Sequence, residues 1–174
     1  MKKIAVFGKP ASGKSTLSKQ LASATGIKLY ALDSILYKSD GEEVSREVYE
    51  KTHERILVSE EWIIEGFGPM NSLLSFNRRL EEAETLIYID LPYWLTYWFV
   101  TKRFFKGLFL KPEGWPDGSS ILKGTLESYK VLKLCPKFWN DDFLQRIEKL
   151  AANKSLHVIR SVAELNSFVE KNVQ

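Results

Sequence analysis

The chain has 174 residues, of which 27% are charged, and a formal net charge of +3. This length predicts one compact domain, residues 1–174, and the small net charge gives no sign of a nucleic-acid-binding protein. A single cysteine, Cys135, excludes an internal disulfide, and the first residues lack a signal-peptide pattern, so we expect a reducing, cytoplasmic setting.

The first apolar run, residues 3–7, predicts a strand that leads directly into the sequence GKPASGKST, residues 8–16. This sequence contains the full Walker A pattern, G-x-x-x-x-G-K-S. Leu17 and Leu21 then lie on one face of a predicted helix, and Gly26 is a plausible end for it. The motif therefore has the strand-to-helix context that a phosphate-binding loop requires.

The residue types of this motif suit a polyphosphate and a divalent cation. Gly8 and Gly13 permit a backbone geometry in which successive N–H groups converge on phosphate oxygens, at the positive end of the following helix. Lys14 supplies a positive charge to the β and γ phosphates, and the Ser15 hydroxyl is placed to ligate Mg²⁺. A plain glycine turn would leave Lys14 and Ser15 without a role. The residues predicted to bind ATP are Gly8, Lys9, Pro10, Ala11, Ser12, Gly13, Lys14, Ser15, Thr16 and Arg160.

Further strands and helices alternate along the chain. Short apolar runs predict four more buried strands, at residues 28–32, 62–67, 85–90 and 155–160. A second helix is predicted to start near Ser45 and to run through Val48 and Ile56, and Ser161 and Glu164 have capping-box spacing at the start of the last helix. This alternation predicts parallel strands joined by right-handed crossovers, in a three-layer α/β domain.

The interval from about residue 104 to residue 153 interrupts the alternation. It opens with a Gly- and Pro-rich stretch, KGLFLKPEGWPDGSS, and continues with two helical patterns separated by Pro136, the second opening near Asn140. Insertions of this size in compact domains are more often mobile functional elements than filler. We therefore predict a lid.

The segment before this interval, residues 91–101, is the most apolar of the chain, but Lys102 and Arg103 end it far short of the roughly 20 residues of a membrane span. An aromatic helix beside basic residues could lie on a membrane surface. We expect instead that it packs in the core behind a strand, and not that its rings stack on a base. The aromatic residues expected in the core are Trp94, Tyr97 and Trp98.

Three acids follow predicted strands, at the end where open parallel sheets bind ligands. Asp33 is a candidate to accept a proton from an acceptor hydroxyl or to hold a magnesium-bound water, with a helix cap as the alternative. Glu65, followed by Gly66, is a candidate magnesium-side acid. Asp90 fits that role equally well by spacing, and its alternative is also a helix cap.

Basic groups are needed to stabilise a transferring phosphoryl group. Arg103 is the best placed, because it ends the aromatic helix where the long interval begins, and we predict that it belongs to a closing lid. The candidates are Arg78, Arg79, Lys102, Arg103 and Arg160.

In these motifs the chain resembles the P-loop kinases of the adenylate-kinase-like group, and more closely the small DNA topology modulation proteins. The stretches that carry the resemblance are the Walker motif, LD at 32–33, VSRE at 44–47, WIIEG at 62–66, RRLEEAETLIYIDLP at 78–92 and RSVAE at 160–164. The resemblance implies a five-stranded parallel sheet in the order 2-3-1-4-5, with ATP as donor, a helical lid after the fourth strand and an acceptor over the second and third strands. This order places Glu65 beside the phosphate loop and favours it over Asp90.

The resemblance also marks a departure at the acceptor site. Where adenylate kinases have Asp-Gly-Phe-Pro-Arg, this chain has EGFGP at residues 65–69, without the arginine that binds the acceptor phosphate. We predict that Arg79, with Arg78, substitutes from farther along the chain. Together with Asp33 these residues form the predicted acceptor site, and AMP is not the expected acceptor.

Two functions follow from these patterns. The first is a magnesium- and ATP-dependent phosphotransferase acting on a small hydroxyl or phosphate acceptor, such as a nucleoside or nucleotide. The second is an ATP-dependent regulatory or DNA-binding module affecting DNA topology, because basic residues outnumber acids in the long interval. A switch GTPase is disfavoured, since the guanine-reading Asn-Lys-x-Asp pattern is absent. The basic residues are Lys102, Arg103, Lys106, Lys111, Lys123, Lys130, Lys133 and Lys137.

Overall fold

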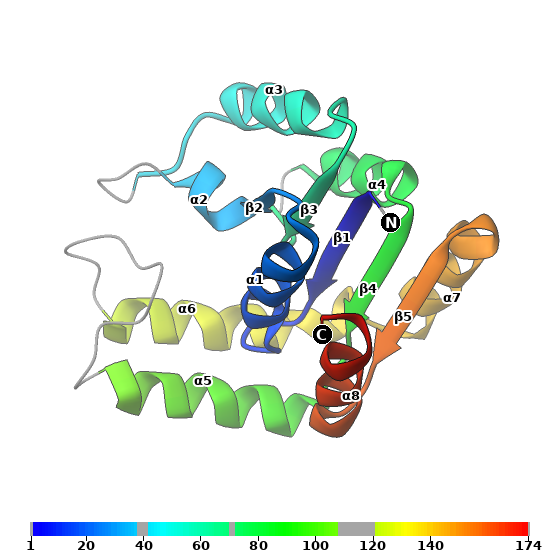
Figure 1. Cartoon of the computed structure of the whole chain (residues 1–174). Coiled ribbons are helices and arrows are strands. Elements are labelled where there is room, and N and C mark those ends of the chain that lie inside the picture. Colours follow the sequence, from blue (N-terminus) through cyan, green and yellow to red (C-terminus); the bar gives the residue numbers. More distant parts are fainter. Residues whose placement is uncertain (1, 38–41, 70–71, 108–120, 174) are drawn as a thin grey trace.

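A computed structural model describes residues 2–37, 42–69, 72–107 and 121–173 of the chain. Its centre is a five-stranded parallel sheet in the order β2-β3-β1-β4-β5 (Figure 1), which confirms the expected topology. The strands are β1 (Lys3–Gly8), β2 (Leu29–Ala31), β3 (Trp62–Glu65), β4 (Thr85–Ile89) and β5 (Ser155–Ile159). Each is up to two residues shorter than the apolar run that predicted it, except β1, which also includes Gly8.

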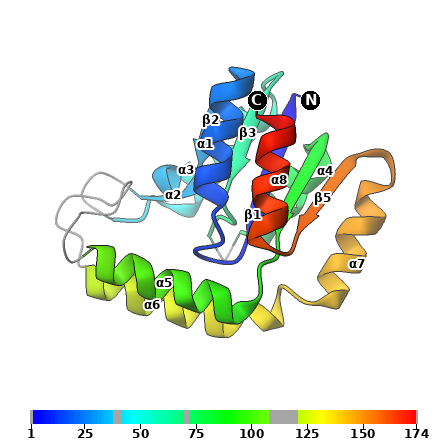
Figure 2. The ribbon, with the colours of Figure 1, turned by 60° about the horizontal axis from the view of Figure 1, so that its bottom comes forward.

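Helices cover both faces of the sheet, and a helical pair crosses the carboxyl ends of its strands (Figures 1 and 2). The helices are α1 (Lys14–Thr25), α2 (Leu32–Leu36), α3 (Arg46–Leu57), α4 (Leu73–Glu82), α5 (Tyr93–Gly107), α6 (Ile121–Leu134), α7 (Asp141–Leu150) and α8 (Val162–Asn172), with short 3₁₀ turns at Cys135–Lys137 and Ala151–Asn153. The predicted three-layer α/β architecture is confirmed.

Alternation along the central strand divides the apolar core into two layers. Val6 of β1 packs with Leu17 of α1 and Phe168 of α8 on one face of the sheet. Phe7 belongs to the opposite layer, which contains side chains of α3, α4 and α7. There the Phe7 ring stacks on Tyr88 of β4, with 5.5 Å between centroids. Every residue from Ile4 to Phe7 is 0% exposed, as a strand covered on both faces requires.

The ends of the helices follow the signals in the sequence. Gly26 ends α1 in the left-handed region, with φ 73°. Ser45, Asn140 and Ser161 each cap a helix by accepting a backbone N–H from three residues farther on. Val48 lies within α3 as predicted, and its side chain is 52% exposed.

The aromatic helix differs most from expectation. α5 forms an antiparallel hairpin with α6 (Figure 2), and Tyr97 stacks on Tyr129 of α6 with 5.8 Å between centroids. Trp94 is 71% exposed and Trp98 is 58% exposed, so the prediction that they pack in the core is wrong. The face of α5 that packs on the domain is the one with the buried Thr96, so the tryptophans on the other face are left exposed.

The described part of the interval predicted to form a lid, about residues 104–153, contains the end of α5 and the whole of α6 and α7. Most of the Gly- and Pro-rich stretch lies outside the described residues. None of the described helices is long and apolar enough to cross a bilayer.

Candidate functional site

The backbone conformation of the loop between β1 and α1, residues 9–13, depends on two glycines. Gly8 precedes the loop, and Gly13 is its last residue. Gly8 has φ +143°, and a Cβ there would lie 2.2 Å from the carbonyl oxygen of Ile89 in β4. Gly13 has φ +89°, a left-handed conformation directly before α1. The Lys14 ammonium donates a 2.7 Å hydrogen bond to the carbonyl oxygen of Lys9. This hydrogen bond therefore links the first residue of the loop to the first residue of α1.

Unpaired donors line the inside of this loop. Ser12 is 0% exposed, and its hydroxyl has no hydrogen-bond partner among the described residues. Within the described part of the chain no side chain caps the N terminus of α1, and Thr16 lies exposed in its first turn. Ala11 has φ 56°, a strained conformation for a non-glycine residue. An orphaned buried hydroxyl, backbone strain and open N–H groups at a helix start together suit an anion.

Glu65 lies beside this loop because β3 pairs with β1, with Val6 opposite Glu65. The Ser15 hydroxyl donates a 3.3 Å hydrogen bond to Oε2 of Glu65. Burial raises the pKa of Glu65, and the positive charge of Lys14 opposes that rise. Burial likewise lowers the pKa of Lys14, with Glu65 as the strongest opposing charge. The hydroxyl and the acid predicted to hold Mg²⁺ are thus in contact.

The charges of Asp33 and Arg103 influence the charged groups beside the loop. Asp33 is exposed in α2, and its negative charge acts on Lys14, Glu65 and Arg103. Burial lowers the pKa of Arg103, and Asp33 opposes that shift. The Arg103 Nη2 also donates a 2.8 Å hydrogen bond to the Ser128 hydroxyl. No sequence pattern indicates Ser128, because Ser128 contacts Arg103 only once the hairpin forms.

Asp90 has a different environment from Glu65. Its carboxylate forms an ion pair with the Lys9 ammonium, and the Tyr88 hydroxyl donates to the same oxygen at 3.0 Å. Lys9 is 2% exposed and lies over the Tyr93 ring, 4.7 Å from its centroid. The Lys9 side chain is therefore directed at Asp90, and its carbonyl oxygen accepts from Lys14. The geometry favours Glu65 over Asp90 as the acid nearest Ser15.

Arg160 follows β5 and lines a cavity of about 290 Å³ beside the Lys9–Asp90 pair. Its backbone N–H donates a 2.7 Å hydrogen bond to the Glu164 carboxylate at the start of α8. Tyr93 and Trp139 form other parts of the wall. The cavity places Arg160 on the β4 side of the loop.

The two arginines of α4 both contact other groups of the protein. Arg78 forms a 2.9 Å ion pair with Glu54 of α3. Arg79 is 0% exposed, and its Nη2 donates to the carbonyl oxygens of Gly66 at 2.8 Å and Phe67 at 3.2 Å. Burial lowers the pKa of Arg79 to about 10. Arg79 thus braces the turn after Glu65 through Nη2, while its Nε and Nη1 have no hydrogen-bond partner among the described residues. The role of both arginines at the acceptor site stays a prediction.

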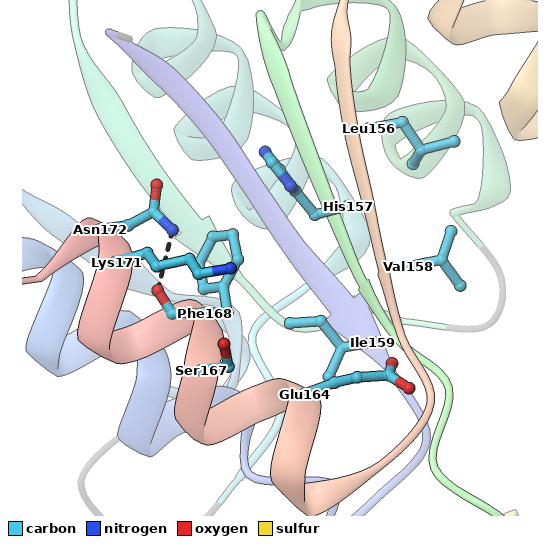
Figure 3. A pocket seen from close by; sticks show the side chains of 9 residues that line it. All are labelled: Leu156, His157, Val158, Ile159, Glu164, Ser167, Phe168, Lys171 and Asn172. Atoms are coloured by element: carbon cyan, nitrogen blue, oxygen red, sulfur yellow. Dashed lines mark hydrogen bonds between the residues drawn. The ribbon is translucent and has the colours of Figure 1, made fainter.

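A second cavity lies away from these groups. It has a volume of about 460 Å³ and lies between the edge strand β5 and α8 (Figure 3). His157 and Phe168 are in ring contact there, with 4.9 Å between centroids. It contains none of the residues predicted for the site.

A metal ion at the loop would not have a cage of protein ligands. Among the residues that the structure describes, no three His, Cys, Asp or Glu side chains are grouped to hold one. Ser15 and Glu65 suit a Mg²⁺ ion that takes most of its ligands from phosphate oxygens and water.

Comparison with known proteins agrees with the architecture. A shikimate kinase from Persephonella marina is 26% identical over 103 residues, which is 53% of this chain and 63% of that protein. The match therefore spans less than two thirds of the relative. No protein-family model matches the chain.

Solved structures of shikimate kinases have the same fold over nearly the whole chain. The enzyme from Acinetobacter baumannii, in complex with shikimate, superposes with a TM-score of 0.58 at 13% identity and covers 98% of this chain and 90% of its own. The enzyme from Bacteroides thetaiotaomicron has a TM-score of 0.53 at 14% identity, covering 97% and 94%. The fold is that of the P-loop kinases.

Proposed function

We propose that this protein is an ATP- and Mg²⁺-dependent kinase that phosphorylates a hydroxyl group of a small molecule. The observation that carries the proposal is the contact of Ser15, at the start of α1, with Glu65 of the neighbouring strand, beside a loop that Lys14 closes through the Lys9 carbonyl oxygen. The P-loop kinase fold and the partial similarity to a shikimate kinase support it.

ATP and Mg²⁺ fit the residues present. The unpaired Ser12 hydroxyl and the uncapped start of α1 are donors for phosphate oxygens. Ser15 and Glu65 would hold the cation, directly or through water. When bound, ATP supplies the phosphoryl group and Mg²⁺ neutralises charge on its oxygens.

Lys14 and Asp33 have complementary roles in this proposal. Lys14 would release the Lys9 carbonyl oxygen and bind the terminal phosphate oxygens of ATP, where its partly buried ammonium would stabilise their charge. Asp33 is exposed at the end of β2 and accepts the proton of the acceptor hydroxyl. The acceptor would lie over the carboxyl ends of β2 and β3.

Arg103 belongs to the lid in this proposal. Its hydrogen bond to Ser128 fixes the guanidinium relative to both arms of the hairpin. Movement of the hairpin as a unit would therefore bring the positive charge onto the transferring phosphoryl group.

The test is a screen for ADP release with Mg-ATP and candidate acceptors, using Lys14→Ala as the blank. Shikimate and related hydroxy acids come first, because the similar enzymes are shikimate kinases, and nucleosides, nucleotides and small alcohols follow. We expect at least one acceptor to raise ADP release well above the blank. If none does, the kinase proposal loses its main support.

The alternative of an ATP-dependent module acting on DNA rests on the resemblance to DNA topology modulation proteins and on the basic residues of the long interval. The similar proteins named above are all shikimate kinases, and none is named for an action on DNA. Steeply salt-dependent binding to duplex DNA, without acceptor-stimulated ADP release, would favour this alternative.

A further inference from the structure

The hairpin of α5 and α6 exposes large apolar side chains on both arms. Trp94 is 71% exposed, and Trp98 and Phe105 are each 58% exposed. On α6, Leu122 is 57% exposed and Leu126 is 50% exposed. Monomeric proteins rarely expose this many large apolar groups on one supersecondary element without a partner for them.

These side chains form one stripe on α5. At 3.6 residues per turn, Trp94, Trp98 and Phe105 lie within about 40° of one another around the helix axis. The buried Thr96 and Val100 lie on the opposite side of the helix. The stripe therefore faces away from the domain core.

Two of the exposed leucines of α6 lie towards the same seam. Leu122, Leu126 and Tyr129 follow one another at helical spacings of four and three residues, so they share a face of α6. Tyr129 is the residue whose ring and hydroxyl contact Tyr97 and Thr101 of α5. The two apolar sets thus border the junction of the antiparallel helices seen in Figure 2.

Lysines border the apolar stripe. Lys102 and Lys106 are exposed on α5, about 80–120° around the helix from Trp94. Lys133 is exposed on α6. Residues 93–107 contain three basic residues and no acid. A partner for this surface must accept apolar side chains at its centre and positive charge at its edge.

We propose that the outer face of the α5–α6 hairpin docks on anionic phospholipid membranes. Tryptophan and phenylalanine side chains insert at the boundary between headgroups and acyl chains, and flanking lysines attract acidic headgroups. The protein would lie on the bilayer without spanning it. The hairpin that carries Arg103 would then be the part of the molecule in contact with the lipid.

Two other partners fit this surface less well. A symmetric second copy would place the lysine-bordered stripe against itself, so that like charges would meet. Nucleic acid would pair with the lysines and could stack on the aromatic rings, but the aliphatic Leu122 and Leu126 gain little from bases or phosphates. Lipid accommodates all three kinds of side chain.

The experiment is flotation of the full chain with vesicles of phosphatidylcholine alone and of equal parts phosphatidylcholine and phosphatidylglycerol. We expect retention on the anionic vesicles, weakened by salt, with a blue shift of tryptophan fluorescence. Lys102→Glu with Lys106→Glu should lower the partition coefficient at least about tenfold. Trp94→Ser with Trp98→Ser should remove both the retention and the blue shift.

Matched controls use exposed residues elsewhere. Leu74→Ser, at a leucine of α4 that is 75% exposed, and Lys51→Glu, at an exposed lysine of α3, should bind vesicles like the unchanged protein. Absence of binding to anionic vesicles would overturn the proposal, as would binding that survives both double substitutions. Binding to DNA, or a dimer, that depends on the same residues without any vesicle binding would also overturn it and identify the true partner.

Discussion

His53 lies in α3 with 0% exposure, and neither ring nitrogen has a hydrogen-bond partner among the described residues. Burial, with the positive charges of Arg79 and Arg78, lowers its pKa from 6.5 to about 4. The unfolded chain therefore takes up this proton at a higher pH than the folded protein. The contribution of the neutral His53 to the unfolding free energy is fully present above about pH 6.5 and is lost as the pH falls towards about 4.

The size of the effect follows from the difference between the two pKa values. The two pKa values differ by about 2.5, and a difference of one corresponds to about 1.36 kcal/mol of unfolding free energy. The contribution of His53 to the unfolding free energy is therefore about 3 kcal/mol at most, and about 2.5 kcal/mol of it is lost by about pH 4.5. Phenylalanine can replace the imidazole in its stack on Tyr49, where the ring centroids are 5.8 Å apart. His53→Phe should therefore remove this part of the pH dependence.

The assay is urea unfolding of both proteins at about pH 7.5 and about pH 4.5. We expect the unfolding free energy of the unchanged protein to fall by about 2.5 kcal/mol more than that of His53→Phe. Comparing the two proteins cancels the contributions of other groups, such as the buried Glu65. Equal losses in both proteins would refute the reasoning.

Three further predictions concern the loop and the lid. Gly8→Ala should lower the unfolding free energy by about 3 kcal/mol or more, because the new Cβ would meet the Ile89 carbonyl oxygen, and unchanged urea unfolding would contradict this. Asp90→Ala should lower the unfolding free energy by about 3 kcal/mol, because it leaves the buried Lys9 ammonium unpaired. The double variant with Lys9→Met should recover most of that loss in the same assay. Equal stability of the single and double variants would show that the broken ion pair is not the cause. Arg103→Ala should slow turnover much more than it weakens ATP binding in steady-state kinetics, and an unchanged turnover would reject its role in the lid.

Much of the fold follows from local signals in the sequence. Short apolar runs locate the strands, because a strand covered on both faces must be apolar throughout. Ser45, Asn140 and Ser161 mark helix starts, since each satisfies a backbone donor that the helix itself leaves unpaired. The order of the strands came from the family resemblance, and no local pattern contains it.

The errors arise where tertiary contacts decide the outcome. Composition cannot tell whether the aromatic face of α5 is covered, and Trp94 proved to be exposed because only the opposite face packs on the domain. Arg79 resembles a solvated or ligand-binding arginine in sequence, but it is buried against the turn at Gly66. The pairing of Lys9 with Asp90 joins residues 81 positions apart, so no spacing rule reveals it.

The central claim is that the loop between β1 and α1 binds the polyphosphate of ATP together with Mg²⁺. Calorimetric titration of the protein with Mg-ATP tests it most directly, with Lys14→Ala and Glu65→Gln as comparisons. We expect saturable binding by the unchanged protein, strongly weakened binding by Lys14→Ala, and a reduced dependence on Mg²⁺ for Glu65→Gln. An unchanged protein that releases no heat, or a Lys14→Ala variant that binds equally well, would contradict the claim.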